Sequence, residues 1–283
     1  MSKTDGMVTV VGLGIIGEIW ANHYAEGGLL AASWNRTPKP GLPKLVGKLE
    51  DGIFEAGVIH VCVADPKAVE AVLERVVPKL TPNHGVIQSS TIGPADSRVF
   101  EKWIQATGAW YLEAPFTGSR PAAEAKKIVF YAGGLEAAFE GAAPYLEVLA
   151  GRIFRFGSGE QAAALKLAMN LQIAAISTAL TEGWHLAKAY GLDDDAFFEA
   201  LAPNVAHSGL ADLKEPMLRS GEVSPMFSVK HMRKDLGLAL AAARDLNLSQ
   251  TERTLEIYQR GIEQGLGELD FIALEKLVGR KDG

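Results

Sequence analysis

The chain has 283 residues, of which 48% are hydrophobic and 22% charged, and its formal net charge is −6. These are the proportions of a soluble globular protein, and the length suffices for two domains of about 150 residues each. No cluster of Lys and Arg marks a nucleic-acid surface, and no uninterrupted apolar run reaches the roughly 18 residues of a membrane span. The polar N-terminus lacks a signal-peptide core, and the one cysteine, Cys62, cannot form an intrachain disulfide. We therefore expect a cytoplasmic protein without nucleic-acid or membrane partners.

The first expected element is an apolar strand that runs into a glycine-rich turn and then a helix. Val8 to Val11 form the strand, and Glu18 to Ala25 have a helical pattern. In such a turn the first glycine permits the sharp bend, the second lets a pyrophosphate approach the backbone, and the third lets the helix pack closely. We predict that this turn binds a dinucleotide, the alternative being a purely structural turn. The residues concerned are Gly12, Leu13, Gly14, Ile15, Ile16 and Gly17.

Strands and helices alternate through the rest of the first half. Strands are expected at 29–34, 58–63, 85–89 and 110–113, and helices at 66–77 and 94–106. This alternation predicts βαβ units and a mostly parallel, doubly wound sheet of the Rossmann type. Residues 128–131 and 153–156 are candidates for further strands at the far edge of that sheet.

The end of the second expected strand selects the cofactor. Asn35, Arg36 and Thr37 follow the strand, where NAD would favour an acidic residue that accepts hydrogen bonds from the ribose hydroxyls. An arginine at this place can pair with the 2′-phosphate of NADP and stack on the adenine. The sequence therefore favours NADP, the alternative being a solvated arginine in a turn.

From Gly159 onward the pattern is helical throughout. Residues 161–190 contain no proline and one glycine, which predicts a single helix of about 30 residues. Shorter helices are expected at 193–201, 209–218, 229–246 and 250–264. The fold class is therefore α/β: a Rossmann domain that binds NADP (1–158) and an all-α domain for substrate binding and dimerisation (159–283), joined by a long interdomain helix. Apolar residues cover more than one seam of that helix, so we expect at least a homodimer in which it packs against the partner.

Two polar clusters in the second half are candidates for chemistry. Lys166 and Asn170 are four residues apart and therefore share one face of the long helix. Small apolar neighbours of Lys166 can hold its ammonium near a substrate oxygen and lower its pKa, the alternative being a surface lysine. The second cluster, Phe227 to Leu236, places several charges within two turns, a pattern more often found on a solvated helix face. The six histidines show no ligand spacing, so we expect no metal.

These segments together resemble the β-hydroxyacid dehydrogenase family, to which 3-hydroxyisobutyrate dehydrogenase belongs. The resemblance covers nearly the whole chain, and it rests on the order and spacing of its segments rather than on any one of them. The segments are 12–17, 35–37, 89–94, 113–119, 157–159, the pair Lys166 and Asn170, and 230–236.

The resemblance implies roles for individual residues. Lys166 falls on the catalytic lysine of the family, the general acid in aldehyde reduction, and Asn170 on the residue that helps to orient the substrate. Thr117, Gly118 and Ser119 fall on the loop that holds the substrate carboxylate, and Phe227 is expected to contact the substrate. Thr91 and Lys234 match positions beside the nicotinamide, where Asp235 supports them.

The substrate loop favours one branch of the family. Thr117-Gly-Ser119 stands where the family usually has Ser-Gly-Gly, and Gly118 to Glu124 is closer to the glyoxylate/succinic semialdehyde reductase branch. The resemblance therefore implies an NADPH-dependent reductase of small carboxylate-bearing aldehydes such as glyoxylate or succinic semialdehyde. The alternatives are an imine reductase of related fold, which usually lacks the lysine, and a non-catalytic dinucleotide-binding scaffold.

Overall fold

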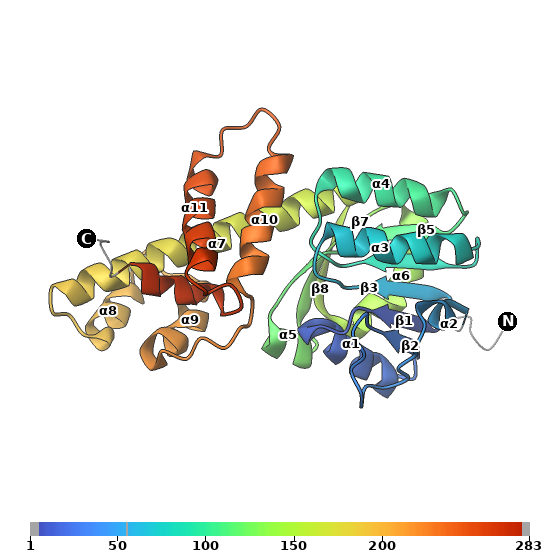
Figure 1. Ribbon diagram of the computed structural model, residues 1–283, viewed down its shortest axis with the longest axis horizontal. Coiled ribbons are helices and arrows are strands. Elements are labelled where there is room, and N and C mark those ends of the chain that lie inside the picture. Colours follow the sequence, from blue (N-terminus) through green and yellow to red (C-terminus); the bar gives the residue numbers. More distant parts are fainter. Residues whose placement is uncertain (1–5, 55, 279–283) are drawn as a thin grey trace. The chain divides into compact units, whose positions relative to one another are not determined.

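The computed structural model describes residues 6–54 and 56–278, and the chain divides into two compact units, Met1–Leu167 and Ala168–Gly283 (Figure 1). This division lies inside the long helix, whereas the boundary expected from the sequence lies at the start of that helix. The predicted boundary at 158/159 stays a prediction.

The first unit is built on one sheet in which five consecutive strands run parallel. The strand order is β2-β1-β3-β4-β5-β7-β6, with β8 paired to β7. The pairs from β2 to β5 are parallel, whereas β7 runs antiparallel to β5 and β6. The strands are β1 (Val8–Val11), β2 (Leu30–Trp34), β3 (Val58–Val61), β4 (Gly85–Gln88), β5 (Trp110–Glu113), β6 (Phe116–Thr117), β7 (Ile128–Gly133) and β8 (Ala150–Phe156).

Helices cover both faces of this sheet, which explains why its strands are apolar on both sides (Figure 1). Val8 and Val10 of β1 pack with helices α1 and α6, whereas Val11 packs with α2, α3 and α4 on the other face. The elements are α1 (Ile15–Glu26), α2 (Leu49–Phe54), α3 (Pro66–Val76), the 3₁₀ turn η1 (Val77–Lys79), α4 (Pro94–Gln105), α5 (Arg120–Glu124) and α6 (Glu136–Leu149). The predicted α/β fold with an N-terminal Rossmann-type sheet is confirmed.

In the second unit the regular elements of the described chain are helices. Helix α7 (Gly159–Ala189) begins in the first unit and continues into this one as the long helix that the sequence predicts. Two apolar clusters hold the others together, one around Met232 and Tyr258 and one around Trp184 and Phe198. The remaining elements are α8 (Asp194–Leu201), α9 (Gly209–Ser220), α10 (Val229–Ala242), α11 (Ser249–Glu263) and the 3₁₀ segment η2 (Phe271–Leu277).

Helix α10 is shorter than the sequence pattern indicates. The apolar periodicity predicts a helix to residue 246, but α10 ends at Ala242. Arg244 has a φ of 55°, in the left-handed region, which a right-handed helix cannot include. An apolar pattern alone does not show such a local change of backbone conformation.

A carboxyl group is fully buried in the first unit, at the end of β5. Glu113 accepts hydrogen bonds from the Tyr111 hydroxyl (2.6 Å) and the Gln88 side-chain amide (2.8 Å). Burial raises the pKa of Glu113 to about 8, although the hydrogen bonds from Tyr111 and Gln88 work in the opposite direction. The folded protein therefore favours the neutral carboxyl at neutral pH.

This raised pKa makes stability depend on pH. Well below pH 4.5 the carboxyl is protonated in both the folded and the unfolded state, so it does not change the free energy of unfolding there. Between pH 4.5 and about 8 the carboxyl ionises only in the unfolded chain, which stabilises the unfolded state. We expect the free energy of unfolding to fall across this window by on the order of a few kcal/mol, and Glu113→Gln to remove that dependence. Urea denaturation at several pH values measures it, with the exposed Glu136→Gln as control. Equal pH dependence in wild type and Glu113→Gln would show that folding does not raise the pKa of Glu113.

Candidate functional site

The turn after β1 requires glycine at two of the three glycine positions of its G-x-G-x-x-G pattern. Gly12 has a φ of 97°, and a Cβ there would collide with the carbonyl oxygen of Cys62, which follows β3. A Cβ on Gly17, in the first turn of α1, would collide with the carbonyl oxygen of Gly12. These two glycines therefore let β1, β3 and the start of α1 come together.

The middle glycine of the pattern has a different environment. A Cβ on Gly14 would find no atom of the described protein within 4 Å. Gly14 is the N-cap of α1 and offers no side chain to its first amides, so these amides and the positive end of the helix dipole remain available to an anion. This geometry fits the pyrophosphate of a dinucleotide.

Asn35 connects this turn to the end of β2. Its side-chain oxygen accepts a hydrogen bond from the Leu13 amide (2.9 Å), and its side-chain nitrogen donates one to the Thr37 carbonyl (2.7 Å). Asn35 is therefore a structural link, and it leaves Arg36 and Thr37 exposed beside the glycine turn.

A second cation lies in the loop after β2, which the sequence analysis did not identify. The Lys39 ammonium is 3.1 Å from a carboxylate oxygen of Glu18 in the first turn of α1. The available signal was a second basic residue within four positions of Asn35, separated from Arg36 by Thr37 and Pro38.

The turn after β4 is held by buried polar side chains. Gln88 accepts a hydrogen bond from the Ser90 amide (2.6 Å) and donates one to the Ser90 carbonyl (3.0 Å). The Ser90 hydroxyl in turn accepts from the Val63 amide (2.8 Å), so the ends of β3 and β4 are joined. The partly buried Thr91, one of the expected cofactor contacts, follows directly after this joint.

Ser89 is fixed by a histidine that carries no charge. His60 on β3 places Nε2 2.8 Å from the Ser89 hydroxyl and Nδ1 3.0 Å from the Tyr24 hydroxyl. Burial lowers the pKa of His60 to about 3, so it stays neutral at physiological pH. Tyr24, His60 and Ser89 thus form a buried hydrogen-bond network that supports the turn after β4.

The expected substrate loop also depends on glycine. Thr117 pairs with Val129 at the end of β6, and Gly118 follows with a φ of 131°. Residues with a side chain rarely adopt this positive φ, so the backbone conformation favours glycine at position 118. Ser119 is the N-cap of α5 but makes no side-chain capping bond. The loop thus presents polar groups from a backbone conformation that glycine imposes.

Lys166 lies in the part of α7 that belongs to the first unit, and its side chain is buried. It is 8% exposed, and its helix neighbours Ala162, Ala163 and Leu167 are also buried. This burial differs from that of a surface lysine, the alternative that the sequence left open. A buried ammonium is the type of group that can act on a substrate proton.

Asn170, Lys234 and Asp235 come together in the second unit. The Asn170 amide donates a hydrogen bond to Asp235 (2.6 Å), and the Lys234 ammonium is 2.9 Å from the other oxygen of that carboxylate. Asp235 is 1% exposed, whereas Lys230 in the same helix is exposed and pairs with Glu268. The charged segment from Phe227 to Leu236 is therefore solvated on one side, at Lys230, and forms a buried polar network on the other, at Asp235.

Phe227, the remaining residue expected to contact the substrate, lies in the second unit, and the sequence predicts no metal site. Phe227 is partly buried two residues before the start of α10, and its ring centroid is 5.9 Å from that of His231. Within residues 6–54 and 56–278 no group of three or more His, Cys, Asp or Glu could hold a metal ion.

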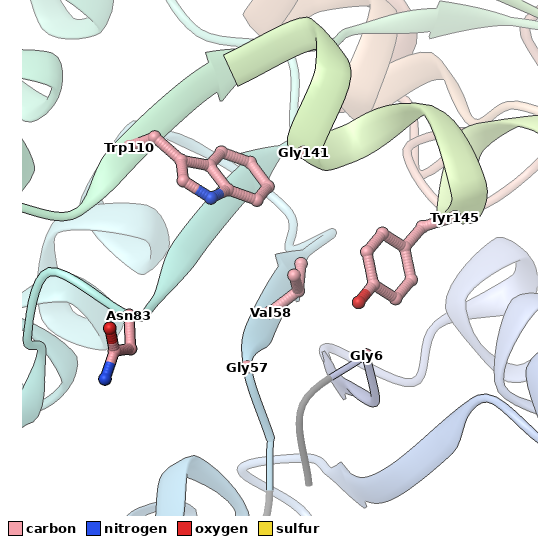
Figure 2. A pocket seen from close by; sticks show the side chains of 7 residues that line it. All are labelled: Gly6, Gly57, Val58, Asn83, Trp110, Gly141 and Tyr145. Atoms are coloured by element: carbon pink, nitrogen blue, oxygen red, sulfur yellow. The ribbon is translucent and has the colours of Figure 1, made fainter. Parts of the chain in front are cut away.

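A cavity of about 370 Å³ opens at the amino ends of the parallel strands, opposite to the carboxyl ends where the glycine turn lies (Figure 2). It is lined at the beginnings of β3 and β5 by Val58 and Trp110, and Figure 2 shows Tyr145 beside them. Ligands of open α/β sheets bind at the carboxyl ends of the strands, where the predicted cofactor residues lie. This cavity is therefore separate from the candidate site.

Comparisons with known proteins cover both halves of the chain. The model of the NAD binding domain of 6-phosphogluconate dehydrogenase matches residues 7–157, and the model for NAD-binding of NADP-dependent 3-hydroxyisobutyrate dehydrogenase matches residues 159–278. Glyoxylate/succinic semialdehyde reductase 1 of Arabidopsis thaliana is 29% identical in an alignment 286 residues long, which covers 96% of this chain and 98% of the relative.

Solved structures show the same fold. The 3-hydroxyisobutyrate dehydrogenase of Mycobacterium tuberculosis, solved with L-serine, has a TM-score of 0.88 at 23% identity, covering 97% of this chain and 99% of its own. An imine reductase from Myxococcus stipitatus, in complex with NADP⁺, has a TM-score of 0.65 at 21% identity, covering 95% and 99%. The chain therefore belongs to the β-hydroxyacid dehydrogenase family, the NAD(P)-dependent oxidoreductases that act on CH–OH groups.

Proposed function

We propose that this protein is an NADPH-dependent reductase of small aldehydes that carry a carboxylate, such as glyoxylate or succinic semialdehyde, and that its products are hydroxy acids. The observation that carries the proposal is the buried side chain of Lys166, one helical turn before Asn170. The 29% identical Arabidopsis relative, named for glyoxylate and succinic semialdehyde reduction, supports the substrate class.

Lys166 is the general acid in this proposal. Bound NADPH supplies the hydride that the aldehyde carbon accepts, and negative charge then develops on the carbonyl oxygen. The Lys166 ammonium stabilises that oxygen and donates a proton to it, which yields the hydroxyl group. In the reverse direction the neutral amine removes the hydroxyl proton.

Asn170 orients the substrate, and Asp235 orients Asn170. The 2.6 Å hydrogen bond to Asp235 fixes which way the Asn170 amide faces, and the Lys234 ammonium balances the charge of the buried carboxylate. Because these groups are linked, we assign Asp235 a positioning role rather than a catalytic one.

The other predicted residues bind the two ligands. We assign the substrate carboxylate to the amides and hydroxyls of Thr117, Gly118 and Ser119, and an apolar substrate contact to Phe227. The pyrophosphate is assigned to residues 12–17, the 2′-phosphate to Arg36 and Thr37, next to Asn35, and the nicotinamide to Thr91 and Lys234. The absence of an acidic residue from 35–39 supports NADPH, because a carboxylate there would repel the 2′-phosphate.

Imine reduction is the second candidate, since the Myxococcus imine reductase shares the fold. Lys166 weighs against it, because an imine reductase of this fold usually lacks the lysine. A non-catalytic dinucleotide-binding scaffold would bind NADPH and turn over no substrate. Cyclic imines assayed beside the aldehydes distinguish these three functions.

We expect the cofactor preference to depend on Arg36. Assays of glyoxylate, succinic semialdehyde and related keto acids should give a kcat/KM with NADPH at least about tenfold above that with NADH, because the guanidinium pairs with the 2′-phosphate. Arg36→Gln should lower kcat/KM with NADPH and leave NADH unchanged, and the exposed Arg155→Gln should change neither. Equal loss with both cofactors would exclude 2′-phosphate recognition by Arg36.

Removal of the Lys166 ammonium should abolish turnover. Lys166→Met keeps a side chain of similar length but removes the ammonium that donates the proton. We therefore expect kcat to fall by about two to four orders of magnitude. The Kd for NADPH, measured by fluorescence titration, should stay near that of wild type. Lys188→Met, at the exposed end of the same helix, is the control. Substantial activity in Lys166→Met would refute the role of the lysine.

We also propose a homodimer in which α7 packs against the partner. By length and composition alone α7 could cross a membrane, a property it shares with core helices of soluble proteins, and 39% of its most apolar stretch is buried within the chain. Ile176 and Leu186 on this helix are 38% and 63% exposed. A second copy would cover this apolar surface.

Analytical ultracentrifugation at micromolar concentration tests the assembly. We expect a species of at least twice the 30.3 kDa chain mass, because burial of apolar helix surface drives association. Ile176→Glu should shift the distribution toward the monomer. A wild-type protein that sediments as a stable monomer would contradict the proposal.

A further inference from the structure

A lysine and an aspartate form an ion pair inside the second unit, and neither is among the residues assigned above. The Lys214 ammonium on α9 is 2.7 Å from Asp270 Oδ1, and the two side chains are 1% and 0% exposed. The ammonium also lies 4.3 Å from the centre of the Phe271 ring and 3.7 Å from the Met217 sulfur. The pair is therefore enclosed by apolar and aromatic groups.

Such a pair is a poor source of stability. Removing both charges from water costs free energy that their attraction seldom exceeds. Burial lowers the pKa of Lys214, and Asp270 works against this effect. A buried pair can nevertheless specify one conformation, since either charge is costly without the other. In this protein the conformation concerned is that of the segment before α10, which Asp270 binds.

Asp270 binds the chain that leads into α10. Its Oδ2 accepts hydrogen bonds from the amides of Met226 (2.9 Å) and Phe227 (3.2 Å), while its Oδ1 also accepts one from Ile272 (3.1 Å). The carboxylate thus receives three backbone donors besides the ammonium. Besides the ion pair with Lys214 on α9, both oxygens of Asp270 therefore bind backbone amides, in the segment before α10 and at the start of η2.

Backbone hydrogen bonds extend this attachment along the segment. The Asp270 amide donates to the Val223 carbonyl (3.0 Å), and the Phe271 amide donates to the Phe227 carbonyl (3.0 Å). Ser228 then caps α10 by accepting from the His231 amide. The position of Phe227 and the first turn of α10 are consequently set by Asp270 and its neighbours.

We propose that the buried Lys214–Asp270 pair is a positioning device that holds Phe227 at the place where it contacts the aldehyde substrate. This inference rests on the proposed function, which assigns the substrate contact to Phe227. Asp270 holds the Met226 and Phe227 amides directly. Lys214 acts through Asp270, because without the ammonium the carboxylate would be a buried charge with no cation and would have to move or take up a proton.

The test uses the full-length protein and three single variants. Asp270→Asn keeps the shape of the side chain but removes its charge and one acceptor oxygen. Lys214→Met keeps the chain length and removes the cation while leaving Asp270 in place. Glu268→Gln is the matched control, since Glu268 forms an exposed ion pair with Lys230 two positions before Asp270. Each protein is assayed for KM and kcat with its best aldehyde, for the Kd of NADPH, and for hydrogen exchange of a peptide covering residues 221–229.

Both pair variants should raise the KM for the aldehyde by about tenfold or more, because a small displacement of a positioning group is enough to weaken substrate binding. We expect kcat and the Kd for NADPH to change by less than about threefold, the pattern of lost substrate binding. Exchange in the 221–229 peptide should accelerate in both variants and stay at the wild-type rate in Glu268→Gln. If Asp270→Asn does not fold, Lys214→Met provides the same readouts.

Two results would overturn the inference: faster exchange with an unchanged KM, or lower thermal stability with both exchange and KM unchanged. A wild-type enzyme that reduces none of the aldehydes would instead refute the proposed function. In that case exchange alone decides whether the pair holds the segment, and an unchanged rate in both variants would reject it.

Discussion

The close approach of backbone at the end of β1 is the constraint on which the cofactor end of the first unit depends. Gly12 lies against the carbonyl of Cys62 and Gly17 lies against the carbonyl of Gly12, so a side chain at either place would push β1, β3 and α1 apart. The approach brings the uncapped start of α1 to the carboxyl edge of the sheet. The open space at Gly14 then has a physical meaning, because it is where an anion can contact the helix amides.

Buried polar groups organise the rest of the candidate site. In the first unit, Gln88 joins the turn that precedes Thr91 to the neutral carboxyl of Glu113. In the second unit, Asp235 holds Asn170 and Lys234, and Asp270 holds the segment before α10. Each group is costly to bury unless its hydrogen bonds are satisfied, so each allows few alternative arrangements. Positioning of this kind is what a hydride-transfer enzyme requires of its protein.

The elements that the sequence predicted well are those with a strong local pattern. The glycine turn gave β1 and α1, and the proline-free apolar stretch gave α7. The antiparallel arrangement of β7 with β5 and β6 was not predicted, because strand direction depends on pairing rather than on composition. Helix α6 was also missed, although its alanine-rich sequence Glu136–Leu149 favours a helix.

Site prediction had a similar limit. Spacing placed Lys166 and Asn170 on one helix face, but the partner that orients Asn170 is Asp235, 65 positions further along the chain. The role of Asn35 as a link to Leu13, and the presence of Lys39 beside Glu18, likewise depend on tertiary contacts. The Lys214–Asp270 pair joins residues 56 positions apart, and neither belongs to a motif. Sequence pattern indicates chemistry along one element, whereas contacts between elements need the fold.

One measurement tests the central claim, that the open turn at Gly14 receives the cofactor pyrophosphate. NADPH is titrated into wild type and into Gly14→Ala, and the melting temperature of each is recorded. Because a Cβ at this position meets no atom of the described residues within 4 Å, the account predicts an unchanged melting temperature. The added methyl group should nevertheless obstruct the pyrophosphate and weaken NADPH binding by about tenfold or more. Equal affinity in the two proteins would show that the cofactor does not bind at this turn and would contradict the account.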